Sequence, residues 1–149
     1  MTTSALVCQY CGCRDSSVPL SIYCARHHAE MLDAVHSSRE RPPNPEITRV
    51  ITDPEFAEAF MVWVGHDARS CPACDDDAIN SHYGEARAAR LLPLLRLVID
   101  DFYASDAAIR VPGMKAMVSR AKEEFAIRYP SSPPEIVEAL AWCYSFDNR

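Results

Sequence analysis

The sequence predicts a mainly α-helical protein with a small β-hairpin module at its N-terminus. Apolar residues recur at helical spacing through the C-terminal two-thirds of the chain. Only four of the 149 residues are glycines, which argues against an all-β fold with many tight turns. The segment 1–40 instead holds four of the seven cysteines and three of the five histidines. We therefore expect a small module over 1–40, a proline-rich joint with a short strand over 41–53, and a helical domain over 54–149.

The stretch "CQYCGC" at residues 8–13 opens the N-terminal module. Cys8 and Cys11 have the C-x2-C spacing of a knuckle, a tight turn that points two thiolates at one metal ion. Cys24 and His27 supply a second pair at the start of an amphipathic helix, where ligands one turn apart can reach the same ion. A ligand set that includes histidine favours Zn2+ over an iron–sulfur cluster, which usually takes four thiolates.

A knuckle, a short hairpin and a ligand pair on a helix start together resemble a treble-clef zinc finger, over about residues 6–38. The resemblance implies one structural zinc ion held by the four side chains just named. His28 is an alternative to His27 as a ligand, and Cys13 is an alternative to Cys11. Because treble clefs serve in nucleases, ribosomal proteins and adaptors alike, the resemblance implies a fold and a metal but no particular activity.

Local chemistry defines the joint and the first helix of the C-terminal part. The stretch "RPPNPE" at 41–46 contains too many prolines to continue a helix, and the β-branched run "ITRVITD" at 47–53 predicts a strand. Asp53 and Pro54 have the residue types of an N-cap and a first helical turn. The helix that they open should end near Gly65.

A second group of metal-binding residue types, "HDARSCPACDDDAINSH" at 66–82, lies between two predicted helices. His66, Cys71, Cys74 and His82 are spaced as H-x4-C-x2-C-x7-H, which predicts a possible second Cys2His2 zinc site. The spacing is similar to the H-x3-C-x2-C element of zinc-containing anti-sigma factors, with one residue more before the first cysteine. Two alternatives stay open: the cysteines are half-buried thiols at a helix start, or they complete a site begun in the segment 1–40.

The rest of the chain is predicted to be helical. The acidic run at 75–77 suits a helix N-terminus, which the helix dipole makes favourable for negative charge. Apolar periodicity then predicts helices over about 85–103, 113–128 and 133–146. Pro93 lies inside the first of these, where it should kink the helix or mark a restart.

Charge and cysteine spacing restrict the class of protein. The formal net charge of −6 and the pI of about 5.3 disfavour nucleic-acid binding, because phosphates would be repelled. Nucleic acid remains an alternative partner through the arginines near the N-terminus, which are Arg14, Arg26, Arg39 and Arg41. Neither a membrane span nor a secretion signal is apparent, so an intracellular protein is expected. In a reducing compartment, cysteines spaced as C-x-x-C are more often metal ligands or redox groups than structural disulfides. A cytoplasmic protein without a membrane partner is expected.

The favoured function is binding to another protein, such as a component of the transcription or translation machinery or a regulatory factor. Exposed aromatic side chains would suit such a contact. The aromatic candidates are Trp63, Trp142, Tyr144 and Phe146, and the alternative for each is a place in the core, where such residues are more often found.

A second hypothesis is an enzyme. His28-Ala29-Glu30, followed later by Cys71 and Cys74, resembles the signature of zinc-dependent nucleoside and nucleobase deaminases. The resemblance implies a zinc ion held by one histidine and two cysteines, with Glu30 moving protons for the metal-bound water. It leaves the N-terminal cysteines without a role. It also needs alternating strands in a part of the chain where helices are predicted.

Overall fold

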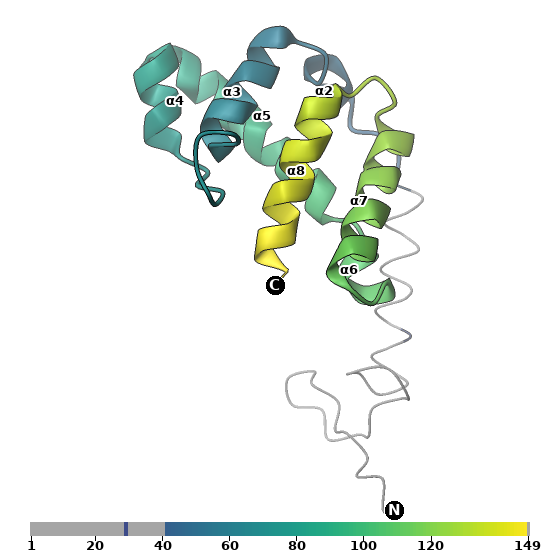
Figure 1. The fold of residues 1–149 in the computed structure, drawn as a ribbon. Coiled ribbons are helices and arrows are strands. Elements are labelled where there is room, and N and C mark those ends of the chain that lie inside the picture. The colour runs from purple at the N-terminus through teal and green to yellow at the C-terminus, as the bar shows by residue number, and fades with distance from the viewer. Residues whose placement is uncertain (1–28, 30–40, 149) are drawn as a thin grey trace, which may run out of the picture. The chain divides into compact units, whose positions relative to one another are not determined.

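A computed structural model describes residues 41–148, together with Ala29. Residues 41–148 form helices and connecting loops with no strand among them, so the mainly α expectation is confirmed for this part (Figure 1). The helices are α2 (Pro45–Val50), α3 (Pro54–Val64), α4 (Asp76–Tyr83), α5 (Glu85–Tyr103), α6 (Ala107–Arg110), α7 (Met114–Arg128) and α8 (Pro134–Asp147).

The predictions made for the N-terminal module lie outside the described residues. They concern the zinc ligands Cys8, Cys11, Cys24 and His27, and the deaminase-like residues His28 and Glu30.

The strand predicted over 47–53 is wrong, because residues Pro45–Val50 form helix α2. The side chain of Asn44 caps this helix and accepts a hydrogen bond from the Glu46 N–H at 2.9 Å. β-branched residues favour strands in general, but here they recur at positions i, i+3 and i+4, which lie on one face of a helix. That face of α2 packs against α5. The three buried side chains of that face are Ile47, Val50 and Ile51. Helix α2 therefore belongs to the helical core.

Helix α3 begins and ends where the sequence predicts. The Asp53 carboxylate accepts a hydrogen bond from the Glu55 N–H at 2.9 Å, as an N-cap does. Gly65 follows the last turn with φ +73°, and its N–H donates to the Met61 carbonyl at 3.0 Å. This left-handed conformation is one that glycine adopts without steric cost.

The later helices also match their predictions closely, with one short addition. Helix α5 continues through Pro93, so this proline does not mark a restart. Helices α7 and α8 begin within one residue of the predicted positions. The four-residue helix α6 was not predicted from the sequence, since it is too short to show a period.

Aromatic residues from α3, α5, α7 and α8 fill the core of this unit. Phe102 of α5 contacts Phe125 of α7 with ring centroids 5.4 Å apart, and Tyr144 of α8 at 5.7 Å. Helix α8 packs against both α3 and α7, and it lies between them in Figure 1. No helix within the described part of the chain is long and apolar enough to cross a membrane.

Candidate functional site

The loop between α3 and α4 carries both cysteines of the second predicted metal cluster, and it is held at both ends. Two backbone hydrogen bonds tie it to α3: the Ala73 N–H donates to the Val64 carbonyl at 3.1 Å, and the Asp75 N–H to the Trp63 carbonyl at 2.8 Å. The Asp75 carboxylate also caps α4 and accepts a hydrogen bond from Arg69 at 2.7 Å. The cysteine loop, residues 65–75, therefore has a defined path.

Cys71 and Cys74 are free thiols on the exposed side of this loop. Cys74 has φ +48°, a left-handed conformation that residues other than glycine rarely adopt. Partial burial raises the pKa of the Cys74 thiol, and the carboxylates of Asp147 and Asp76 raise it further. The thiol is therefore protonated at neutral pH unless a bound cation stabilises the thiolate.

The two histidines of the predicted cluster make other contacts. His66 Nδ1 lies 3.2 Å from the Asp67 carboxylate. The His66 ring packs edge-on against Trp142, with the two ring centroids 5.1 Å apart. His82 Nε2 lies 3.4 Å from the Glu58 carboxylate. Among the residues that the structure describes, no three Cys, His, Asp or Glu side chains are grouped so that they could hold a metal ion. This conformation does not assemble the Cys2His2 site predicted from His66, Cys71, Cys74 and His82.

Two of the four aromatic residues predicted to contact a partner belong to the core. Trp63 is 3% exposed, and its indole N–H donates to Asp76 at 2.9 Å. Tyr144 is 2% exposed, and its hydroxyl accepts a hydrogen bond from the Ala108 N–H at 3.1 Å. Buried aromatic residues with satisfied polar atoms have a structural role. Trp142 and Phe146 therefore remain as surface candidates.

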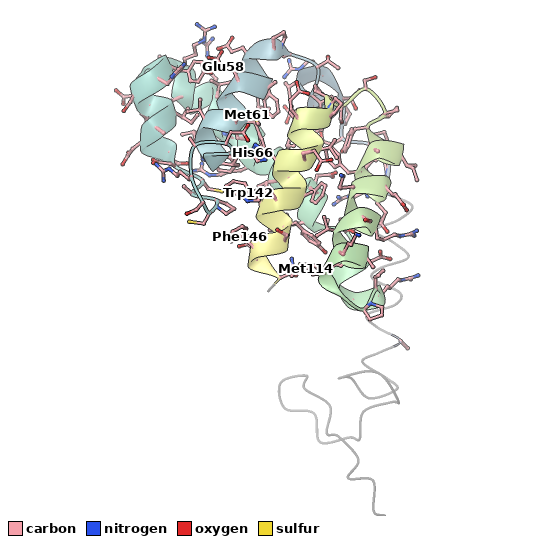
Figure 2. All side chains as sticks on the ribbon, in the orientation of Figure 1. Glu58, Met61, His66, Met114, Trp142 and Phe146 are labelled. Atoms are coloured by element: carbon pink, nitrogen blue, oxygen red, sulfur yellow. The ribbon has the colours of Figure 1, made fainter. Side chains whose placement is uncertain are left out.

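Trp142, Phe146 and His66 form an aromatic strip along the seam between α3 and α8. Trp142 and Phe146 lie one turn apart on α8, are half-buried, and have ring centroids 5.7 Å apart. His66 joins them from the residues that follow α3. Figure 2 shows Met61 of α3 next in line with these three side chains. The strip brings partly exposed aromatic surface onto one face of the helical unit.

A groove of about 320 Å³ lies at the other end of the same two helices. Its apolar lining is Pro54, Ala57 and Met61 of α3, and its charged lining is Glu58 of α3 and Glu135 of α8. Both helices have their first turns at the groove and their last turns near the strip, so α3 and α8 run in the same direction. Met61 lines the groove and also extends the line of the aromatic strip (Figure 2). The groove and the strip therefore share one face.

The sequence analysis missed this groove, although part of its signal was present. Pro54, Ala57, Glu58 and Met61 are spaced at i, i+3, i+4 and i+7, which is one face of a helix. That face mixes apolar residues with one acid, so its pattern is not typical of core. Glu135 comes from the last helix of the chain, and only the packing of α8 on α3 brings it there.

A buried carboxyl group, Asp106, and a partly buried one, Glu124, lie side by side elsewhere in the unit, between α6 and α7. Asp106 is 3% exposed, with its carboxylate 2.9 Å from Arg110 Nε. Burial raises the pKa of Asp106 to about 6, and the neighbouring Glu124 raises it as well. Burial alone would raise the pKa of Glu124 too, but hydrogen bonds from Asp106, Ser105 and Arg120 lower it on balance. Perturbed carboxyl groups of this kind occur both in functional sites and in structural networks, and here they connect two helices.

Comparison of the chain with models of known protein families, with curated protein sequences and with solved structures gave no match.

Proposed function

We propose that this chain is a cytoplasmic zinc-binding protein that regulates another protein by binding it through the α3–α8 face. The aromatic strip carries this proposal, because Trp142, Phe146 and His66 present half-buried rings beside each other on a surface. Large rigid aromatic side chains bury much area at little cost in side-chain entropy, and tryptophan is enriched where binding energy concentrates. A component of the transcription or translation machinery is the class of partner that we favour.

The zinc part of the proposal rests on the ligand spacing in the segment 1–40. A segment of that length cannot bury a sufficient core, and a structural metal is the usual substitute. The three cysteines of the helical unit, Cys71, Cys74 and Cys143, are free thiols, which agrees with a reducing compartment.

The two competing functions receive less support from the helical unit. A deaminase fold needs strands after its histidine and glutamate, whereas residues 41–148 contain none. A nucleic-acid surface needs clustered cations, but the groove on the α3–α8 face is lined by two glutamates.

Site-specific photocrosslinking in the native cell tests the proposed function. The photoreactive amino acid p-benzoylphenylalanine replaces Phe146 in one variant and the exposed Asp100 of α5 in a control variant. We expect a discrete crosslinked protein with the probe at position 146 and none with the probe at position 100. Equal crosslinking at both positions, or none at position 146, would contradict binding through this face.

A further inference from the structure

We propose that the groove between the first turns of α3 and α8 binds a cationic amphipathic helix of the partner protein. This inference rests on the proposed function, because the groove continues the face that carries the aromatic strip. An apolar side chain of the partner would lie on Met61 and Ala57. Lysine or arginine side chains beside it would face Glu58 and Glu135.

The size and lining of the groove suit part of a protein rather than a cofactor. Its volume of about 320 Å³ is at the low end of the roughly 300–1,000 Å³ typical of small-molecule sites. Its apolar lining comes from Pro54, Ala57 and Met61, and it includes no aromatic ring of the kind that holds a polyproline segment. An aliphatic anchor from a partner helix matches such a surface.

The secondary structure around the groove favours a helix as the bound element. Residues 41–148 contain no strand, so this unit offers no sheet edge to which an extended peptide could add. The groove instead lies between two helices that run in the same direction. A third helix placed in such a groove contacts both through side chains at i, i+3, i+4 and i+7.

The charge of the groove selects a cationic partner. The Glu58 carboxylate is 61% exposed, lies 3.4 Å from His82 and also interacts with the Tyr83 hydroxyl. Glu135 is exposed and has no ion pair to any described residue. Residues in the first turns of α3 and α8 also line the groove, and each helix N-terminus contributes roughly half a positive charge. Two full carboxylate charges exceed these two half charges, so the groove stays negative. The net charge of −6 adds to the attraction of a cationic segment at long range.

The test measures the binding of synthetic helices to the full chain by fluorescence anisotropy. One peptide has leucines on one face with lysines beside them, and a matched peptide has glutamates in place of the lysines. We expect the lysine peptide to bind, with an affinity that falls as salt is added, and the glutamate peptide not to bind. Glu58→Lys combined with Glu135→Lys should weaken the binding of the lysine peptide at least about tenfold.

Two further variants separate the groove from general charge and from misfolding. Asp100→Lys combined with Glu123→Lys makes the same change in net charge at exposed positions outside the groove, and should alter the affinity by less than about twofold. Ala57→Gln narrows the apolar floor while keeping a good helix former, and should also weaken binding. Circular dichroism checks the fold of each variant. If the double Glu→Lys protein does not fold, Glu58→Gln and Glu135→Gln replace it.

The outcomes distinguish this inference from the proposed function. Equal binding of the two peptides, no binding of the lysine peptide, or an equal loss in the Asp100→Lys and Glu123→Lys control would overturn the groove proposal. A crosslink at position 146 would still support a partner on this face in each of those cases. Conversely, groove-dependent binding of the lysine peptide without any crosslink in cells would support the groove proposal and contradict the proposed function.

Discussion

At the scale of single residues, the carboxyl pair between α6 and α7 links proton binding to stability. Asp106 and Glu124 lie close enough to share a hydrogen bond, and burial makes two negative charges there unfavourable. One of the two is therefore favoured in its protonated form up to a higher pH than usual. Arg110 and Arg120 lie beside the pair, at 2.9 Å from Asp106 and Glu124 respectively, and limit the effect.

The stability of the helical unit should therefore decrease as pH rises from about 4.5 to 6. The pKa of Asp106 is raised from 3.8 to about 6, so its contribution is complete below 3.8 and is lost as pH rises through 6. The pKa of Glu124 is lowered from 4.5, so its contribution is present above 4.5 and is lost at lower pH. Thermal unfolding followed across this range should show the decrease in the wild type.

Asp106→Asn is the matched variant for this prediction. Its unfolding temperature should change less between pH 4.5 and 6, because the variant cannot release that proton. An equal pH dependence in the two proteins would show that groups other than Asp106 are responsible.

Single residues also show why the site was only partly predictable from the sequence. Trp63 and Trp142 both follow helical apolar patterns, yet Trp63 is core and Trp142 lies in the aromatic strip. The difference arises from which helix packs over each ring, and that is a property of the tertiary structure. The histidine spacing around Cys71 and Cys74 predicted a four-ligand group, but His66 and His82 contact Trp142 and Glu58 instead.

At the scale of elements, helix ends were predictable and helix packing was not. The N-cap Asp53 and the C-terminal Gly65 act within a few residues, so the sequence contains their whole signal. Helix α2 was mistaken for a strand because a run of β-branched residues is a weak local preference. Packing against α5 overrides that preference.

Ile47→Ala tests whether α2 is part of the helical core. Ile47 has no exposed surface, so the substitution should lower the free energy of unfolding by about 2–4 kcal/mol. Arg49→Ala on the exposed side of the same helix should change it by less than about 0.5 kcal/mol. Urea unfolding measures the free energy of unfolding of both variants. Similar small effects for the two variants would indicate that α2 is a linker helix with no part in the core.

At the scale of the whole molecule, residues 42–148 have a hydrophobic core of their own. Their buried cluster consists of aliphatic and aromatic side chains from α2 to α8. The proposed finger in the segment 1–40 would depend on zinc instead. The two parts should therefore respond differently to metal removal.

Elemental mass spectrometry of the purified chain should find zinc, and Cys8→Ser should lower the content by one ion per chain. Cys143→Ser is the control, because Cys143 is buried in the helical core and its loss should leave the zinc content unchanged. A strong chelator should remove the zinc while most of the helical circular dichroism signal remains. Unchanged zinc in Cys8→Ser, or loss of the helical signal on chelation, would contradict this division.

The contrast between the cysteine loop and Cys143 gives the molecule a built-in reporter of its own unfolding. Cys71 and Cys74 face solvent, whereas Cys143 is 1% exposed and burial raises its pKa to about 12. An alkylating reagent can therefore reach Cys143 only when α8 leaves the core. The rate at which this one thiol is modified, followed by peptide mass spectrometry, would report how often the native helical unit opens, with no denaturant and no engineered cysteine.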